Sequence, residues 1–501
     1  MSTATGELQS DSPTLVGGSA SRLKAVTIDV VIVPAATLSS ATLGRIDAGG
    51  IPVPRYDRTA LSPRILHLGV GGFHRAHLAL YVHELAEAGG DWGIRGVGRL
   101  EGDRRMERVL ASQDCLYTLI ERDSHGSRPQ VVGSIVDYVL TVGDAGSFAQ
   151  RIADPVVAIL SMTITEGGYG LERPNPTLEA IADGLDARRH AGGRPLTVMS
   201  CDNLPGNGNV AQAAVMAVCD RRDPKLARYV ETACTFPNSM VDRITPQTTD
   251  ADRGWLRDTI GVDDGWPVVA EPFRQWVIED RFAASRPSFE DVGVLFTDDV
   301  HDWEIYKLRM LNATHSCMAY LMALHGVAYV DEAMAIPAVR RYLERFLAAE
   351  AIPALDEIPG HPAAAYGRTV LSRYQNTGVR DQIARLCIDG TAKFPTFLIP
   401  TIEEQIERDG PLECAALALA GWARYLATTP VAERAYDASG DRSAALAARA
   451  LGEPLAFLEL DDVFTPRVRE SARFRAAFVH AAASLAASGA LGAIEGVAGA
   501  D

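Results

Sequence analysis

Four side chains capable of proton transfer or hydrogen bonding lie close together between Asp302 and His315. At about 100° per residue and with Lys307 at zero, a helix places Glu304 at about 60° and His315 at about 80°. Asn312 follows at about 140°. One helix face therefore carries an amine, a carboxylate, an imidazole and an amide, a set that suits proton transfer beside a polar substrate.

Two interpretations of this face are open. Lys307 and Glu304 are spaced i, i+3 and can form an ordinary surface pair, worth about 0.2–0.5 kcal/mol. Alternatively, apolar residues on the opposite side, such as Leu308 and Leu311, bury the helix. Desolvation then lowers the pKa of Lys307 and makes it a general base near neutral pH. The rest of the chain has to supply a substrate and a cofactor to decide between the two.

One segment has the order strand, glycine turn and helix. Ile65–Leu68 is predicted as a buried strand, and a helical pattern runs from Phe73 until Gly89–Gly90 ends it. Such a turn lets a backbone approach the pyrophosphate of a dinucleotide closely. We predict cofactor contacts at the turn residues Gly69, Gly71, Gly72 and Phe73. The third glycine of the usual pattern is His74 here, so an ordinary turn is the alternative.

A second predicted strand, Trp92–Gly98, is followed by the acidic residues Glu101 and Asp103. A carboxylate just past the carboxyl end of this strand can accept hydrogen bonds from the ribose of NAD and repel the 2′-phosphate of NADP. Arg99 and Arg104 lie nearby and can instead attract that phosphate. We predict NAD as the cofactor.

Two further apolar runs predict central parallel strands with polar loops at their carboxyl ends. Residues 156–165 lead into a loop that begins with Glu166, which we assign to the cofactor site. Leu196–Ser200 leads into a loop that contains Asn203. Ligands of open α/β sheets bind at this edge, so Asn203 is placed to donate to a substrate oxygen. Ordinary turn chemistry is the alternative interpretation of its loop.

Strand signals stop well before the C-terminus. Late strands are predicted at 266–273 and 292–296, and the periodicity after them is helical almost throughout. We therefore predict an α/β plus all-α protein, with a Rossmann-like NAD-binding domain at residues 37–299 and an α-helical substrate and catalytic domain at residues 300–501. Residues 1–36 are predicted to be a flexible extension.

Composition places the chain among soluble globular proteins. Of its 501 residues, 47% are hydrophobic and 22% are charged, and the formal net charge of −16 argues against a nucleic-acid partner, which would need a basic face. The seven cysteines have no Cys-x-x-Cys spacing, which favours reduced thiols in the cytoplasm over disulfides or a zinc site. We expect no metal, no signal peptide and no membrane span, and we predict a packed terminal helix for the apolar tail.

Five segments together resemble one family, the polyol-specific long-chain dehydrogenases/reductases, which includes the mannitol 2-dehydrogenases. The segments are 69–77, 163–169, 200–205, 236–246 and the spacing Lys307-x4-Asn312-x2-His315. That last spacing is the signature of the family. The resemblance implies a Rossmann-like domain followed by a helical domain, and metal-independent hydride transfer between NAD and a polyol or its ketose.

The resemblance also implies residue roles. The catalytic roles fall on five residues: the general base on Lys307, the donors to the developing alkoxide on Asn203 and Asn312, substrate positioning on His315, and proton relay toward solvent on Glu304. Substrate contacts are implied at Asp242, Arg385 and Lys393. Asp103 matches the family carboxylate that binds the ribose of NAD. From the residues alone, Asp242 forms one half of a buried ion pair with Arg243, and Arg385 and Lys393 are surface cations.

Mannitol and fructose are the substrate pair that we expect. A fructuronate (hexuronate) reductase and a dehydrogenase of D-arabinitol or sorbitol are the alternatives within the family. A cofactor-binding protein without catalysis is an alternative from another class. The resemblance further implies a monomer that binds a small polyol or ketose.

Overall fold

The computed structural model describes residues 35–171, 175–437 and 439–499. Residues 1–34 of the predicted extension lie outside these ranges. Ala36, which the prediction placed at the end of the extension, is buried in strand β1 (Ala36–Thr37). This strand pairs with β11 (Val262–Asp263), so the end of the predicted extension belongs to the folded part.

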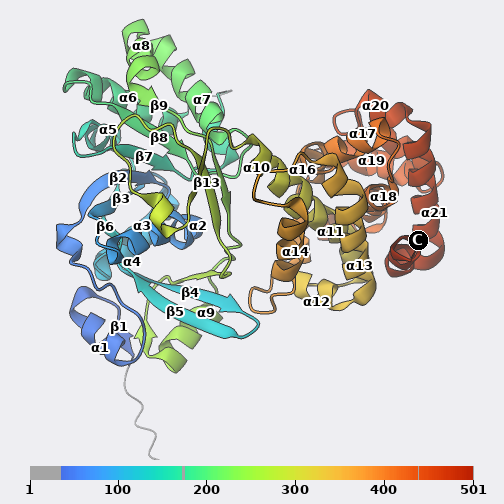
Figure 1. Ribbon diagram of the computed structural model, residues 1–501, viewed down its shortest axis with the longest axis horizontal. Coiled ribbons are helices and arrows are strands. Elements are labelled where there is room, and N and C mark those ends of the chain that lie inside the picture. Colours follow the sequence, from blue (N-terminus) through green and yellow to red (C-terminus); the bar gives the residue numbers. More distant parts are fainter. Residues whose placement is uncertain (1–34, 172–174, 438, 500–501) are drawn as a thin grey trace, which may run out of the picture. The chain divides into compact units, whose positions relative to one another are not determined.

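A six-stranded parallel sheet forms the centre of the N-terminal part (Figure 1). Its spatial order is β6 (Ile135–Leu140), β3 (Trp92–Gly98), β2 (Ser62–Leu68), β7 (Ile159–Met162), β8 (Leu196–Ser200) and β9 (Cys234–Thr235). The four strands predicted for this region are all present, although β7 is shorter than its apolar run. The strand order reverses between β2 and β7, and open α/β sheets bind ligands at the carboxyl ends of the strands at such a position.

Both faces of this sheet are covered. Ile65 belongs to a hydrophobic cluster that includes residues of α3, whereas the next residue, Leu66, belongs to a cluster that includes residues of α6 and α7. Successive strand side chains point to opposite faces, so the strand needs a nearly continuous apolar run. The helices of this part are α1 (Leu43–Ala48), α2 (Gly72–Ala76), α3 (Leu78–Glu87), α4 (Arg104–Ser112), α5 (Ala145–Ala153), α6 (Pro176–His190), α7 (Asn207–Arg222), α8 (Pro224–Ala233) and α9 (Asp250–Trp255).

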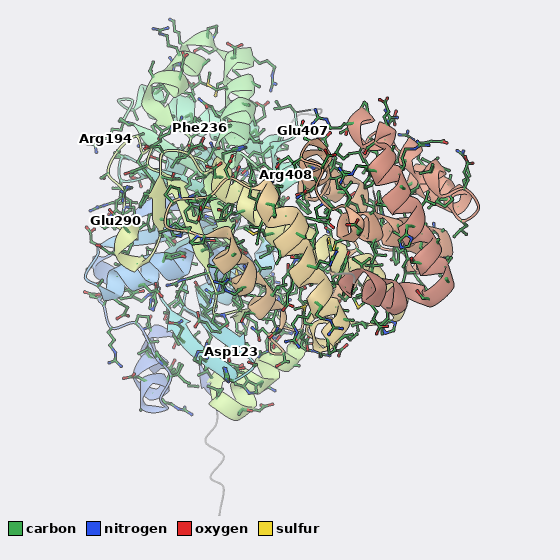
Figure 2. The ribbon with its side chains drawn as sticks, turned by 45° about the vertical axis from the view of Figure 1, so that its right-hand side comes forward. Asp123, Arg194, Phe236, Glu290, Glu407 and Arg408 are labelled. Carbon is green, nitrogen blue, oxygen red and sulfur yellow. The ribbon has the colours of Figure 1, made fainter. Side chains whose placement is uncertain are left out.

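Besides the pair of β1 and β11, two three-stranded sheets belong to the N-terminal part. The first contains the antiparallel hairpin of β4 (Tyr117–Asp123) and β5 (Gly126–Val132), together with β12 (Val268–Ala270). Figure 2 labels Asp123 at the end of this hairpin. The second contains β10 (Ser239–Asp242), β13 (Gln275–Glu279) and β14 (Leu295–Thr297). The predicted late strands correspond to β12 and β14, whereas the hairpin and β13 were not predicted from the sequence.

No strand of the described ranges follows Thr297, and the rest of the chain folds into helices. They are α10 (His301–Tyr306), α11 (Ala313–His325), α12 (Val330–Ala335), α13 (Pro337–Arg345), α14 (Ala363–Tyr374), α15 (Ile383–Leu386), α16 (Gly390–Phe397), α17 (Ile399–Glu407), α18 (Glu413–Thr428), α19 (Gly440–Ala450), α20 (Pro466–Glu470) and α21 (Ala472–Ala498). The central helix α18 is apolar on all sides and contacts both α11 and α21. A parallel α/β sheet followed by a mainly helical part confirms the predicted fold class.

The C-terminal helix α21 is long and apolar enough to cross a membrane by length and composition alone, a test that core helices of soluble proteins also pass. Phe474, Phe478 and Leu485 belong to the hydrophobic core of the helical part. Gly489, with φ at 68°, interrupts the helical backbone. These features fit the predicted packed terminal helix.

Candidate active site

The helix predicted at 302–315 consists of three consecutive segments. They are α10, a π-helix (Lys307–Asn312) and α11. A π-helix forms i→i+5 hydrogen bonds and therefore turns less per residue than an α-helix. The angle predicted between Lys307 and Asn312 is wrong for this reason. The two residues are five positions apart, which is the span of one π-helical hydrogen bond. Their side chains therefore lie nearer to the same helix face than an α-helical wheel predicts.

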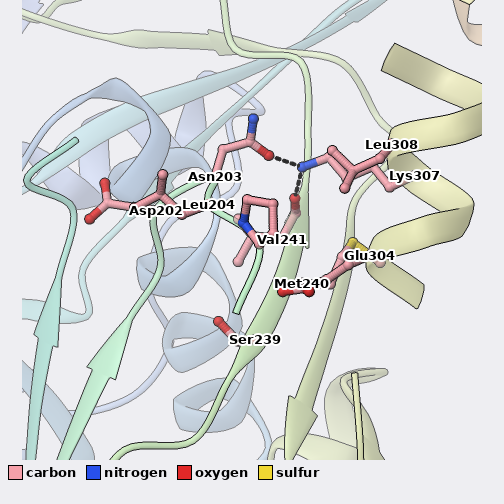
Figure 3. A pocket seen from close by; sticks show the side chains of 10 residues that line it. Asp202, Asn203, Leu204, Ser239, Met240, Val241, Glu304, Lys307 and Leu308 are labelled. Carbon is pink, nitrogen blue, oxygen red and sulfur yellow. Dashed lines mark hydrogen bonds between the residues drawn. The ribbon is translucent and has the colours of Figure 1, made fainter. Parts of the chain in front are cut away.

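Lys307 is buried and hydrogen-bonded across the junction between the sheet and the helices. Lys307 and Glu304 are each only 8% exposed, so the surface-pair interpretation is wrong. The Lys307 Nζ donates to the backbone oxygen of Val241 in β10 at 2.6 Å, and to Oδ1 of Asn203 in the loop after β8 (Figure 3). These acceptors occupy two of the three hydrogen-bonding positions around Nζ.

The surroundings of Lys307 favour its neutral form. Burial is the largest influence on its pKa and lowers it. Asp242 and Glu304 oppose this effect, and Arg373 adds to it. A lowered pKa increases the fraction of neutral amine near neutral pH, which is the form that accepts a proton. The direction of this shift is the one that a general base near neutral pH requires.

Glu304 lies one helical turn before Lys307. Its carboxylate accepts from the backbone N–H of Gly206, at 2.9 and 3.1 Å, just before α7 begins. Burial raises the pKa of Glu304 to about 7. Glu304, Lys307, Asn203 and Ser239 are among the residues that line a cavity of about 20 Å³ (Figure 3), enough for about one water molecule. This carboxyl group can therefore gain and lose a proton near neutral pH beside the lysine.

Asp242 at the end of β10 has a different ionic partner from the predicted one. Its carboxylate accepts from the Arg373 guanidinium at 2.7 and 2.9 Å and from the Tyr366 hydroxyl at 3.3 Å. Arg243 instead donates to Glu121 at 2.6 Å. Neighbouring side chains of an extended segment point in opposite directions, which keeps these two apart. Both residues are buried as predicted, but the predicted pair between them is wrong.

His315 on α11 lies among several charged side chains. Its ring stacks on Tyr374 with 4.2 Å between ring centroids, and its Nε2 is buried without a hydrogen-bond partner in the described ranges. Burial lowers the pKa of His315 to about 3, and the charges that also influence it are those of Asp381, Arg385, Arg373 and Lys393. A neutral imidazole with an unused nitrogen can hydrogen-bond to a substrate hydroxyl.

The other residues predicted to bind substrate lie near His315. Arg385 is exposed and donates to Asp381 at 2.8 and 2.5 Å. Lys393 is half-buried and donates to the backbone oxygen of Leu386 at 3.2 Å. Asn312, the last residue of the π-helix, is also half-buried. The structure therefore gathers the predicted substrate side chains around α11 and the end of α14.

The glycine turn lies where the strand order reverses. Gly69 has φ at 93°, and a Cβ at this position would collide with the backbone oxygen of Thr163, which follows β7. Gly71 precedes the first residue of α2. The helix predicted to continue from Phe73 is interrupted at His77, whose backbone (φ −123°, ψ −93°) separates α2 from α3. Only a residue without a side chain fits at Gly69, so this glycine lets the turn pack closely against the segment that follows β7.

His74, at the position of the third glycine, packs differently from glycine. It is buried and stacks on His67 of β2 with 3.5 Å between ring centroids. A glycine at this position normally lets the helix lie close to the strand. Burial lowers the pKa of both rings, so both are neutral and stack without charge repulsion. Two stacked imidazole rings therefore lie between the helix and the strand, where a glycine would let the two backbones approach closely.

Asp103 and Glu166 are the two acidic residues assigned to the cofactor site, and the structure describes the side chain of Asp103 alone. Asp103 accepts through Oδ2 from the backbone N–H groups of Arg99 and Leu100, at 2.8 and 2.9 Å. This oxygen stabilises the loop after β3. The backbone of Glu166 begins the 3₁₀-helix η4 (Glu166–Tyr169), and its side chain lies outside the described part. In the described ranges, no three His, Cys, Asp or Glu side chains are grouped so as to hold a metal ion.

Comparisons with known proteins cover nearly the whole folded chain. The family model of the mannitol dehydrogenase Rossmann domain matches residues 63–291, and that of the mannitol dehydrogenase C-terminal domain matches residues 299–486. A mannitol 2-dehydrogenase of Phaeosphaeria nodorum is 39% identical over 479 residues, which cover 90% of this chain and 84% of that protein. The chain belongs to the mannitol dehydrogenase family.

Other members of the mannitol dehydrogenase family match at similar identity. A mannitol dehydrogenase of Saccharomyces cerevisiae is 36% identical, over 92% of this chain and 97% of that protein. The structure of Pseudomonas fluorescens mannitol 2-dehydrogenase in a ternary complex with NAD and D-mannitol has a TM-score of 0.82 and 35% identity, covering 93% of this chain and all of that one. A substrate-free D-sorbitol dehydrogenase has a TM-score of 0.83 and 34% identity, covering 91% of this chain and all of that one.

Sequence reasoning missed three residues that surround the site of this mannitol dehydrogenase family member. They are Tyr366, Arg373 and Tyr374, all on α14. Arg373 and Tyr366 contact Asp242, and Tyr374 stacks on His315. The spacing of seven residues between Tyr366 and Arg373, which places both on one helix face, is a signal that the sequence does carry.

Proposed function

We propose that this protein is an NAD-dependent polyol dehydrogenase that interconverts mannitol and fructose. The observation that carries the proposal is the buried Lys307, held by Asn203 and Val241 near the carboxyl ends of the sheet strands. The glycine turn lies at the same edge of the sheet. Oxidation of a secondary alcohol removes a proton from oxygen and a hydride from carbon, so it needs a base beside a hydride acceptor.

The proton-transfer roles follow from the contacts. Lys307 accepts the proton of the substrate hydroxyl. Asn203 binds Lys307 through Oδ1, which turns its Nδ2 away from the lysine (Figure 3) and leaves that group to donate to the oxygen that becomes negatively charged. We assign Asn312 as a second donor to this oxygen. Glu304, with a pKa of about 7, receives the proton from Lys307 through the small cavity and passes it to solvent.

The dinucleotide site is proposed at the turn between β2 and α2. The tight turn at Gly69 and the uncrowded backbone at Gly71, just before α2, fit the close approach of a pyrophosphate. Gly72, Phe73, Asp103 and Glu166 complete the proposed contacts, with Asp103 favouring NAD over NADP. NAD, when bound, supplies the acceptor for the hydride. In this proposal residues 37–299 form the cofactor domain and residues 300–501 the substrate and catalytic domain.

The polyol is proposed to lie between β10 and α11. Asp242, His315, Arg385 and Lys393 are the proposed contacts to its hydroxyl groups. The Pseudomonas fluorescens relative was solved with D-mannitol, and the similar D-sorbitol dehydrogenase makes sorbitol the nearest alternative, with D-arabinitol a further one.

A hexuronate substrate is less well supported than a neutral polyol. Binding fructuronate requires a cation for its carboxylate. Arg373 is paired with Asp242 and Glu271, and Arg385 is paired with Asp381. Both guanidinium groups are thus already neutralised by protein carboxylates. Among the proposed substrate contacts, the remaining cation for a carboxylate is Lys393, whose Nζ donates to the Leu386 backbone oxygen.

We also propose a monomer in the cytoplasm. All seven cysteines are free and buried, which suits a reducing compartment. The state of assembly can be measured by light scattering of the purified protein. A mass of one chain supports the monomer, and a multiple of that mass contradicts it.

The test of the function is a substrate panel followed through the absorbance of NADH. Mannitol, sorbitol and D-arabinitol are offered with NAD and with NADP, and fructose and fructuronate are offered with NADH. We expect the fastest turnover with mannitol and NAD, and with fructose in the reverse direction. Faster reduction of fructuronate would identify a hexuronate reductase. Binding of NADH without turnover of any compound would identify a binding protein.

A further inference from the structure

Arg373 joins the helical part of the chain to two buried carboxylates of the sheet part. Its guanidinium donates to both oxygens of Asp242, at 2.7 and 2.9 Å, and to both oxygens of Glu271, at 3.0 and 2.7 Å. All three side chains are at most 5% exposed. Asp242 ends β10 and Glu271 directly follows β12, whereas Arg373 lies near the end of α14. One cation thus fixes the orientation of two carboxylates.

This cluster adjoins the proposed base directly. Asp242 follows Val241, whose backbone oxygen accepts from Lys307. We propose that Arg373 is a positioning residue, which holds the Asp242 carboxylate in the orientation that receives substrate hydroxyl groups beside Lys307. The proposal rests on the polyol dehydrogenase function proposed above. Arg373 acts through Asp242 and Lys307 and needs no contact with the substrate.

The chemistry of the carboxylate supports this role. Each carboxylate oxygen can accept two hydrogen bonds. In Asp242, Oδ1 accepts from Arg373, and Oδ2 accepts from Arg373 and from Tyr366. Oδ1 therefore keeps an acceptor position for a substrate hydroxyl, while the two guanidinium bonds fix the plane of the group. Without Arg373, the Tyr366 hydroxyl at 3.3 Å is the side-chain donor left to Asp242 in the described part of the chain, and Asp242 and Glu271 repel each other.

The charge of Arg373 also acts on Lys307. The charged groups around the lysine are Asp242 on β10, Arg373 on α14 and Glu304 on α10, with Glu271 behind Arg373. Arg373 lowers the pKa of Lys307 and Asp242 raises it. Removal of Arg373 therefore raises this pKa. Oxidation needs the neutral lysine, so the low-pH limb of the rate profile moves to higher pH.

A neighbouring cavity makes chemical rescue possible. The Arg373 guanidinium packs over the Phe273 ring, 4.0 Å from its centroid. Both residues line a cavity of about 800 Å³. In an Arg373→Ala variant, a guanidinium ion from solution can enter through this cavity and occupy the vacated position. Rescue of this kind restores a charge and its hydrogen bonds. A variant that has lost its activity through misfolding does not regain it in this way.

The experiment compares full-length wild-type protein, Arg373→Ala and a matched control. The control is Arg95→Ala, since Arg95 also pairs with two carboxylates, Asp137 and Asp154, within the sheet part. Arg373→Ala is expected to lower kcat/KM for mannitol by about 10²-fold, a typical cost of misplaced reacting groups. Its low-pH limb is expected to move to higher pH, and millimolar guanidinium chloride is expected to restore part of the activity. Arg95→Ala should change none of these.

Both the shifted limb and the rescue are required. The absence of either in a folded Arg373→Ala protein overturns the positioning role. If that variant does not fold, Arg373→Lys is used in its place, because lysine keeps the charge and loses the bidentate geometry of the guanidinium. A raised KM for mannitol is then expected, and a wild-type KM overturns the proposal. If the wild type does not oxidise mannitol, the proposed function fails by itself. The same variants are then compared on the compound that the wild type does turn over.

Discussion

We expect Glu304 to make the free energy of unfolding of the wild type fall as the pH rises. Replacing Glu304 by Gln should remove this fall. Burial raises the pKa of this carboxyl group from its ordinary value of 4.5 to about 7. At about 1.4 kcal/mol for each pH unit, this difference corresponds to about 3 kcal/mol. The Gln side chain keeps an oxygen that can accept from the Gly206 N–H and loses the titration.

The sign of the effect follows from proton linkage. Between about pH 4.5 and about pH 7 the folded protein holds the Glu304 proton and the unfolded chain has released it. The folded state binds more protons in this range, so the free energy of unfolding falls as the pH rises. Below about pH 4.5 both states are protonated and the contribution of Glu304 does not change. The Gln variant should therefore gain about 3 kcal/mol relative to the wild type between about pH 4.5 and about pH 7.

The assay is thermal unfolding by calorimetry at several pH values between about 4.5 and 8. Asp302→Asn is the matched control, because it removes an exposed carboxylate from the same helix. Glu304→Gln should flatten the pH dependence of stability, and Asp302→Asn should leave it unchanged. Equal pH slopes in the wild type and Glu304→Gln would contradict the burial argument for Glu304.

Two further predictions concern the oxyanion donor and the cofactor turn. Asn203→Ala should lower kcat for mannitol oxidation by about 10²–10³-fold, because one donor to the developing alkoxide is lost. Steady-state kinetics test this, and a change confined to KM would contradict it. Gly69→Ala should weaken NADH binding about tenfold or more, because φ at 93° and the Thr163 oxygen leave no room for a Cβ. Fluorescence titration measures it, with Gly44→Ala as control because that glycine has open space around it; unchanged affinity in Gly69→Ala refutes the assignment.

Local signals were sufficient for much of the fold and for part of the site. The apolar runs before Gly69 and Asn203 predicted β2 and β8, because a parallel strand covered on both faces needs such a run. The glycine turn and the polar loop follow these strands directly in the sequence. Both lie at the same edge of the sheet, because the carboxyl ends of parallel strands point the same way.

Other features depend on contacts between residues that are far apart in the sequence. Arg373 is 131 residues away from Asp242, and its helix has an ordinary amphipathic sequence, so the predicted partner of Asp242 was its neighbour Arg243 instead. The π-helix at Lys307–Asn312 was likewise missed, since hydrophobic spacing does not distinguish one i→i+5 turn inside an α-helix. The stacked rings of His67 and His74 explain why a histidine is accepted where a glycine was expected.

The most direct test of the central claim is the rate of mannitol oxidation by Lys307→Ala with saturating NAD, measured across the pH range. Loss of a general base typically costs about 10²–10⁴-fold in rate. We predict a loss of kcat in this range, disappearance of the low-pH limb that the wild type owes to the lysine, and unchanged NADH affinity. A Lys307→Ala protein that oxidises mannitol at close to the wild-type rate, with the same pH profile, would contradict the assignment of Lys307 as the base.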